Sequence, residues 1–298
     1  MSAPQARSPG RDGGLLVESV GLPGGPRLAV RRADGVRRPF LLVHGLASNA
    51  RLWDGVAHRL AAAGHAVAAV DLRGHGESEQ TVDGYDTPTV ATDLAALVGE
   101  LGWTGALAPV VAGQSWGGNV ALDLAARAGA AAGLALVDGG WIHLADRFAD
   151  FEDCWRVLAP PSFDGLRRVD LEARLAAWTA GWPPESVAGV LGNFVDNGEG
   201  TVRARLAREH HREILRSLWE VDPRPLYPRV SVPALLLVAD GDGADGDAKR
   251  TAVHGALAGL PDAEVRWYTG AHHDLHAQQP ERTTADLLAL AARVEARA

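Results

Sequence analysis

Short apolar runs alternate with longer segments of helical period from Leu15 onward, and this alternation constrains the fold more than any other feature. The runs are bounded by turn residues, as strands are, and the segments between them have the spacing of amphipathic helices. This rhythm is typical of strands joined by crossover helices in a mostly parallel sheet. We therefore expect an α/β fold with eight strands and with helices on both faces of the sheet.

The expected elements follow directly from the rhythm. Strands are expected at Leu15 to Ser19, Arg27 to Arg32, Phe40 to His44, Ala66 to Asp71, Leu107 to Ala112, Leu134 to Asp138, Ala234 to Ala239 and Val265 to Thr269. Helices are expected near residues 50–62, 86–101, 116–128, 247–259 and 281–297. No helical segment separates the first two strands, so these two are expected to pair antiparallel.

The same rhythm divides the chain into regions. Residues 1–14 are rich in Pro, Gly, Ser and Arg and are expected to form a loose tail. Residues 15–139 and 231–298 form the expected α/β core. Between them, residues 140–230 contain successive helical stretches without a convincing strand, which predicts an inserted helical cap.

Composition excludes several classes of function. The 298 residues carry 29 Lys and Arg against 37 Asp and Glu, a net charge of −8, so a nucleic-acid partner is not expected. No apolar run approaches the roughly 18 residues of a membrane span, and the tail lacks the apolar stretch of a secretory signal. A single cysteine, Cys154, allows no intrachain disulfide. A cytoplasmic protein without a metal or cofactor is expected, and its oligomeric state stays open.

One motif stands between an expected strand and an expected helix. Gly113-Gln114-Ser115-Trp116-Gly117 has the form G-x-S-x-G and follows the apolar run that ends at Ala112. In this setting the serine occupies a strained turn, and the flanking glycines leave room for the strand and the helix. The motif predicts that Ser115 is a nucleophile, which needs a histidine base oriented by a carboxylate.

On these residues the chain resembles the α/β-hydrolase-fold proteins with a helical cap, the group that holds esterases, lactonases, C–C bond hydrolases and cofactor-free haloperoxidases. The resemblance extends from about Leu15 to Ala298. It implies an acid and then a histidine after the serine. Gly270-Ala271-His272-His273 resembles the Gly-x-Gly-His segment of the family, which implies that His273 is the base, with His272 as the alternative.

The acid is expected in the loop after the strand at Ala234 to Ala239, where four aspartates lie close together. The family ends this strand with Gly-x-x-Asp, and aligning Ala239 with that glycine selects Asp242. Asp240 and Asp245 are alternatives from the same loop. Asp138 is a further alternative at the end of the preceding strand, because related folds sometimes take the acid from that position.

Acyl transfer also needs two donors for the developing oxyanion, and backbone amides suffice. The family pattern implies the N–H of Trp116, after the nucleophile, and the N–H of Leu46, in the segment His44-Gly45-Leu46.

Residues 140–230 hold nine of the fourteen Trp and Phe residues, which form either an apolar acyl pocket or the core of the cap itself. Trp116, Trp141, Trp155 and His210 are the candidate substrate contacts.

The sequence therefore predicts a serine hydrolase that cleaves a small apolar ester, lactone or thioester through Ser115, His273 and Asp242. A C–C bond hydrolase, an acyl-transferase and a haloperoxidase-like enzyme are alternatives on the same triad. A non-hydrolytic ligand-binding or cyclising protein is the alternative of another class.

Overall fold

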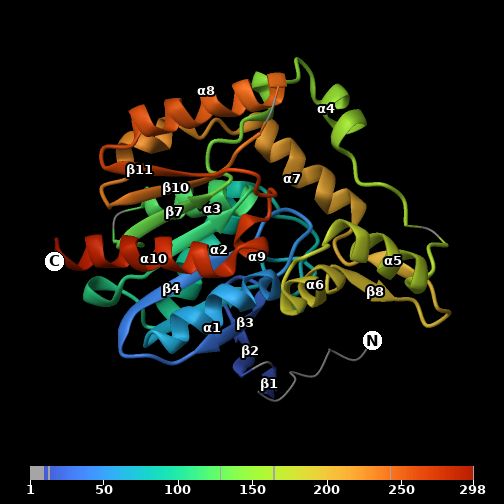
Figure 1. Cartoon of the computed structure of the whole chain (residues 1–298), viewed down its shortest axis with the longest axis horizontal. Helices are drawn as coiled ribbons and strands as arrows, with labels where there is room; N and C mark the ends of the chain where they lie inside the picture. The colour runs from blue at the N-terminus through green and yellow to red at the C-terminus, as the bar shows by residue number, and fades with distance from the viewer. Residues whose placement is uncertain (1–9, 13, 128, 164, 242, 298) are drawn as a thin grey trace.

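A nine-stranded sheet forms the centre of the computed structural model, which describes residues 10–12, 14–127, 129–163, 165–241 and 243–297 (Figure 1). The strands of this sheet are β1 (Gly10–Asp12), β2 (Leu15–Gly21), β3 (Arg27–Ala33), β4 (Arg37–Val43), β5 (His65–Val70), β6 (Val110–Gln114), β7 (Gly133–Val137), β10 (Ala234–Ala239) and β11 (Ala263–Tyr268). Their order across the sheet is β1-β2-β3-β5-β4-β6-β7-β10-β11. Every pair from β5 to β11 is parallel, whereas β1, β2, β3 and β5 pair antiparallel.

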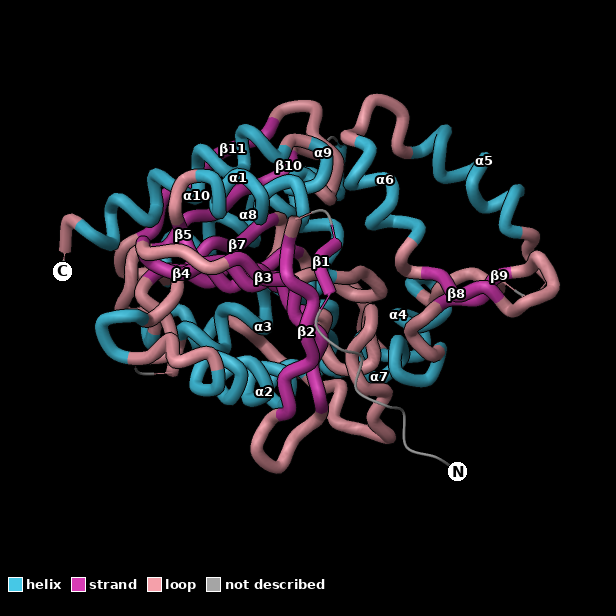
Figure 2. Tube along the Cα trace, turned by 90° about the horizontal axis from the view of Figure 1, so that it is seen from below, coloured by secondary structure: helices cyan, strands magenta, loops and turns pink. Residues whose placement is uncertain are grey.

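Helices cover both faces of this sheet, as the sequence predicts. The α-helices are α1 (Asp54–Ala62), α2 (Thr87–Glu100), α3 (Trp116–Ala125), α4 (Phe151–Leu158), α5 (Arg168–Trp178), α6 (Pro184–Leu191), α7 (Arg208–Glu220), α8 (Gly243–Gly259), α9 (Leu275–Gln278) and α10 (Pro280–Glu295). Figure 2 shows α1 and α10 on one side of the sheet and α2 and α3 on the other. Alternate residues of β6 explain this arrangement, because Val111 packs into the core on the α2 side and Val110 into the core on the α1 side.

Two expectations about where strands begin are wrong. The tail expected over residues 1–14 is ordered at β1, which pairs antiparallel with β2 and carries an ion pair of 3.0 Å from Asp12 to Arg31. Residues 1–9 lie outside the described residues. The strand expected from Leu107 begins at Val110 instead, because residues 105–107 form a 3-10 turn and Pro109 has no N–H for a sheet ladder.

Residues 140–230, the predicted cap, contain α4 to α7 and a small hairpin of β8 (Phe194–Asp196) and β9 (Val202–Ala204) (Figure 1). Hydrogen bonds join this segment to the core at several places, two of them on α7 and α6. The Ser217 hydroxyl on α7 accepts a hydrogen bond of 2.9 Å from the N–H of Thr87, at the start of α2. The Ser186 hydroxyl on α6 donates one of 2.8 Å to the carbonyl of Ala277 in α9. The role of this segment as a cap stays a prediction.

None of the helices in the described part of the chain combines the length and the apolar composition that a membrane crossing needs.

Candidate active site

Ser115 lies in the turn between β6 and α3, at the carboxyl end of a central strand. Its backbone has φ 54° and ψ −125°, a conformation that costs a non-glycine residue free energy and is found mainly at functional sites. Two backbone hydrogen bonds hold it there. The N–H of Ser115 donates to the carbonyl of Val137 at 2.9 Å, and the N–H of Gly118 donates to the carbonyl of Ser115 at 2.8 Å.

Glycines around Ser115 are required by close backbone contacts. A Cβ atom on Gly113 would lie 2.1 Å from the carbonyl oxygen of Gly117, and one on Gly117 would lie 2.3 Å from that of His44. These clashes confirm the reason for small residues at both positions of the motif. A third position, Gly139, was not singled out by the sequence, although its Cβ would lie 2.0 Å from the carbonyl oxygen of Ser115. The glycine pair after the strand β7 was the available signal.

His273 lies in the loop between β11 and α9, with its ring paired to a carboxylate. The distance from its Nδ1 to Oδ2 of Asp138 is 2.6 Å. The side-chain amide of Gln114 donates a hydrogen bond of 3.3 Å to the carbonyl of His273, so the loop is bonded to the residue that precedes Ser115. The side chain of His273 is 47% exposed, and no hydrogen bond to its second nitrogen, Nε2, is present among the described residues.

His272, the alternative base, makes different contacts. Its backbone N–H donates to the Gln278 side chain at 2.7 Å, and its ring lies edge-on to Trp178 and Trp182 at 4.8 and 5.3 Å between centroids. Of the two histidines, His273 is therefore the one that has the buried carboxylate of Asp138 as its partner.

Asp138 occupies the place at His273 that the sequence assigns to Asp242. Its side chain is 1% exposed, its backbone has φ 45°, and its Oδ1 accepts a hydrogen bond of 3.1 Å from the N–H of Ala239. Asp242 itself lies outside the described residues, as does the side chain of Asp245. Asp240 is exposed and pairs with Arg250 at 3.4 Å.

The charge of His273 depends on this carboxylate. Desolvation of the ring disfavours the imidazolium, but the hydrogen bond and the negative charge of Asp138 outweigh it, so the pKa of His273 is raised. One more charged group, Lys249 on α8, contacts both oxygens of Asp138. No local pattern in the sequence marks Lys249 as part of the site, although it is the single lysine of the chain.

The two predicted oxyanion donors belong to the start of α3, directly after Ser115, and to the loop after β4. In the part of the chain that the structure describes, neither the N–H of Leu46 nor that of Trp116 donates a hydrogen bond. The loop of Leu46 approaches closely, since a Cβ on Gly45 would lie 3.0 Å from the Ser115 Cβ. Two unused N–H groups beside a nucleophile are what an oxyanion site requires.

Two buried histidines hold that loop in place. His44 Nε2 accepts the N–H of Leu72 at 3.0 Å, and His75 Nε2 accepts the N–H of Ala47 at 3.2 Å. Burial lowers the pKa of His44 to about 4 and that of His75 well below its ordinary value, so both rings are neutral acceptors. These contacts give His75 a structural role in the loop.

The four candidate substrate contacts are mostly engaged elsewhere. The Trp116 indole is fully buried and donates to the Thr87 hydroxyl at 3.0 Å, and Trp141 is buried in the core. Trp155 is covered by the guanidinium of Arg208, 4.9 Å from its ring centroid. His210 stacks on Tyr85 with 4.0 Å between centroids.

Two other tryptophans reach the loop of the base. Trp178, at the end of α5, is 44% exposed, and Trp182 packs against it with 5.0 Å between centroids. Both contact His272, the neighbour of His273. The sequence included them only in the general aromatic enrichment of residues 140–230, because their contact with a loop about ninety residues away has no local signal.

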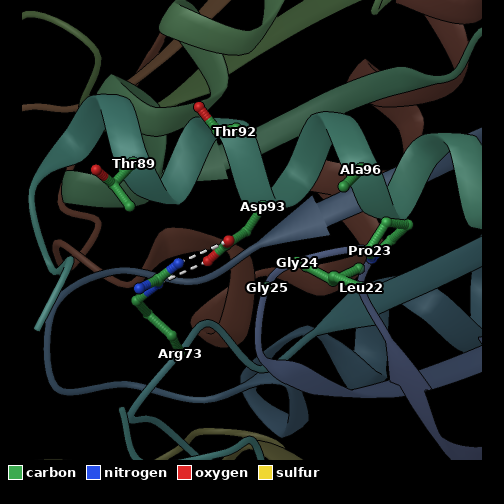
Figure 3. A pocket seen from close by; sticks show the side chains of 9 residues that line it. All are labelled: Leu22, Pro23, Gly24, Gly25, Arg73, Thr89, Thr92, Asp93 and Ala96. Carbon is green, nitrogen blue, oxygen red and sulfur yellow. Dashed lines mark hydrogen bonds and ion pairs between the residues drawn. The ribbon is translucent and has the colours of Figure 1, made fainter. Parts of the chain in front are cut away.

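A separate surface pocket lies between the β2–β3 turn and α2 (Figure 3). At its base the guanidinium of Arg73 makes two hydrogen bonds of 2.7 Å to the carboxylate of Asp93. Its charge is thereby already compensated, and none of the lining residues is one of the residues around Ser115.

Comparison with known proteins agrees with this geometry. A family model described as the alpha/beta hydrolase family matches residues 40–287. The chain belongs to the alpha/beta hydrolase family. The match spans the strained serine, its unused amide donors and the paired histidine, so the residues assembled above lie within the alpha/beta hydrolase region.

Relatives of this alpha/beta hydrolase chain include two that align with most of it. The non-heme haloperoxidase of Rhodococcus erythropolis is 28% identical over 267 residues, which are 85% of this chain and 92% of that protein. The non-heme chloroperoxidase of Streptomyces lividans is 29% identical over 271 residues, 86% and 91% of the two chains. The AB hydrolase superfamily protein YisY of Bacillus subtilis is 34% identical over 93 residues, only 31% of this chain and 34% of that protein.

Solved structures share the fold at lower identity. E-2-(acetamidomethylene)succinate hydrolase superposes with a TM-score of 0.73 and 22% identity, covering 93% of this chain and 98% of the other. The thioesterase domain from the curacin biosynthetic pathway superposes with a TM-score of 0.71 and 21% identity, covering 92% and 99%. Both establish the alpha/beta hydrolase architecture of the chain.

Proposed function

We propose that the protein is a serine hydrolase that cleaves a carboxylic ester, lactone or thioester with an apolar acyl group through an acyl-enzyme on Ser115. The observation that carries this proposal is the 2.6 Å pair of His273 and Asp138, bonded through Gln114 to the turn of Ser115. A strained serine, an oriented base and two unused amide donors together are the parts that acyl transfer needs.

In the proposed mechanism the Ser115 hydroxyl attacks the carbonyl carbon and gives its proton to Nε2 of His273. Asp138 accepts the Nδ1–H of the ring, which fixes the tautomer and stabilises the imidazolium that forms. The N–H groups of Leu46 and Trp116 bind the oxyanion of the tetrahedral intermediate. His273 then protonates the leaving alcohol or thiol, and water, activated by the same base, releases the acid.

We assign the acid to Asp138 instead of Asp242. Nδ1 of His273 lies 2.6 Å from the buried carboxylate of Asp138, which leaves Nε2 as the ring nitrogen for the serine proton. Asp138 is also held by the backbone N–H of Ala239, so its position does not depend on the histidine alone. A carboxylate in the loop of Asp242 would have to displace this arrangement.

The apolar acyl group is proposed to lie against Trp178 and Trp182. These rings belong to residues 140–230, which we propose to act as the cap, and they border the loop of the base. The Trp178 side chain is 44% exposed, so part of its surface is available to a ligand.

Labelling with a fluorophosphonate and mass spectrometry tests the proposal. Wild type is expected to be labelled at Ser115 only, and Ser115→Ala is expected to abolish both labelling and ester turnover. Asp138→Asn should lower kcat/KM about 10⁴-fold by favouring the wrong tautomer. Asp240→Asn and Asp242→Asn, in the neighbouring loop, serve as matched controls that keep activity.

Two outcomes would overturn parts of this proposal. Loss of labelling in Asp242→Asn with full labelling in Asp138→Asn would return the acid to Asp242. A folded wild type that is neither labelled nor active on esters, lactones and thioesters, but binds a small molecule tightly, would favour a ligand-binding or cyclising protein.

A second acyl acceptor is suggested by the two haloperoxidase relatives, which align with 85% and 86% of the chain. In this alternative hydrogen peroxide replaces water and attacks the same acyl-enzyme, giving a peracid. Product analysis with water, an alcohol and peroxide in competition separates hydrolysis from acyl transfer to the other acceptors.

A further inference from the structure

The single lysine of the chain lies against the carboxylate that we assign to the triad. Among 29 Lys and Arg residues only Lys249 is a lysine. Its Nζ donates to Oδ1 of Asp138 at 3.1 Å, to Oδ2 at 3.0 Å and to the carbonyl of Ala239 at 3.1 Å. Its side chain is 29% exposed, so the ammonium is partly removed from water. A compact ammonium with three donors suits these three acceptors, which lie on two neighbouring strand ends.

This contact changes the charge balance of the site. A carboxylate with 1% exposure needs a countercharge, and the imidazole of His273 supplies one only while it is protonated. Within the described ranges, Lys249 is the lysine or arginine that contacts Asp138, so it supplies that countercharge. When His273 accepts a proton, two cations share Oδ2 of Asp138, at 2.6 and 3.0 Å.

Other charged and titratable groups also lie near His273 in the described part of the chain. Asp138 and Asp274 favour the imidazolium, whereas Lys249 opposes it. His276, in α9, is fully buried and is itself kept neutral by burial, which lowers its pKa to about 4. His272 lies in the same loop, with its ring turned to the tryptophans. Lys249 is therefore the permanent positive charge that counteracts the two aspartates.

We propose that Lys249 is a positioning residue of the triad, which holds Asp138 in place and, by sharing its charge, keeps His273 free of protons at lower pH. The inference rests on the proposed function and adds to it a control of the pH range. A base that stays neutral remains able to accept the serine proton. The competing interpretation is an ion pair that only stabilises the fold, and this interpretation predicts no change in the pH profile.

The test compares Lys249→Met with Lys249→Arg, which keeps the charge, and with Arg250→Met, which removes a charge from the next residue of α8. The acidic limb of the kcat/KM profile on a model ester is expected to move to higher pH by about one pH unit in Lys249→Met. It should stay near the wild-type position in the two other variants. A limb that stays unmoved in Lys249→Met, or moves equally in Arg250→Met, would overturn the proposal.

A second measurement separates this inference from the proposed hydrolysis. NMR titration of the His273 ring, assigned with His273→Asn, reports its protonation even in a protein without turnover. The midpoint of this titration is expected to rise in Lys249→Met. An inactive wild type would refute the proposed hydrolysis, but the titration would still test the role of Lys249. Lys249→Gln retains two N–H donors without the charge and should shift the limb in the same direction. Failure of both neutral variants to fold, with a folded Lys249→Arg, would assign Lys249 to stability and overturn the positioning role.

Discussion

His276 is expected to make the stability of the fold depend on pH, and its replacement by phenylalanine isolates that effect. The ring is fully buried in α9, against Trp53 at 4.2 Å between centroids. In the described part of the chain, neither of its nitrogens has a hydrogen-bond partner. Burial disfavours the charged form and lowers the pKa of His276 to about 4.

The size of this stability change follows from the pKa of His276 in the unfolded chain and in the folded chain. In the unfolded chain the ring titrates near its ordinary pKa of about 6.5, so between about pH 6.5 and 4 unfolding takes up one proton at this residue. The folded-state pKa is depressed, and the stability is therefore complete above about pH 6.5 and falls as the pH is lowered. The loss is about 1.4 kcal/mol per pH unit, or roughly 3 kcal/mol over the interval.

Urea unfolding of wild type and His276→Phe at half-unit steps of pH measures this contribution. The difference between the two free energies of unfolding should change by about 1.4 kcal/mol per pH unit below about pH 6.5, in favour of the variant. His254→Phe, at an exposed position of α8, controls for the substitution itself. Parallel stability curves for wild type and His276→Phe from pH 6.5 to 4.5 would refute the reasoning.

Two further outcomes follow from the site. Gly117→Ala should lower the free energy of unfolding by about 3 kcal/mol or prevent folding, because its Cβ would lie 2.3 Å from a backbone oxygen. Gly99→Ala, in α2 with open space around it, should instead stabilise by about 0.5–1 kcal/mol in the same urea titration. Trp178→Ala should lower kcat/KM about 10-fold for an ester with a bulky apolar acyl group but little for an acetate ester, with an almost unchanged Tm. Trp155→Ala is the matched control, and an equal loss on both esters would contradict the acyl contact.

The strands and the strained turn of Ser115 were predictable because their signals are local. The turn of Ser115 needs glycines at fixed neighbouring positions, and buried parallel strands appear as short apolar runs. The three-residue β1 has no such pattern, since Gly10–Asp12 contains no apolar side chain, and it is held by backbone pairing with β2.

The carboxylate partner of His273 was not predictable for a different reason. Strands β7 and β10 are parallel neighbours, and the N–H of Asp138 donates to the carbonyl of Leu237 at 2.7 Å, so both strands end at the same edge of the sheet. An aspartate after either strand is near the base, and the choice between Asp138 and Asp242 depends on distances of a few ångströms. The contact of Lys249 with the end of β10 likewise depends on the folded structure and has no local signal in the sequence.

The pairing of β7 with β10 also governs when the site can form during folding. These strands are adjacent in the sheet but separated by residues 138–233, so their pairing closes a long loop, and the contact of Asp138 with His273 spans 135 positions of the chain. Loop closure on this scale is entropically costly and slow, whereas the two backbone hydrogen bonds that hold Ser115 reach only to Gly118 and Val137. The Ser115 turn can therefore form before Asp138 and His273 meet, because their contact requires the segment between β7 and β10 to be looped out.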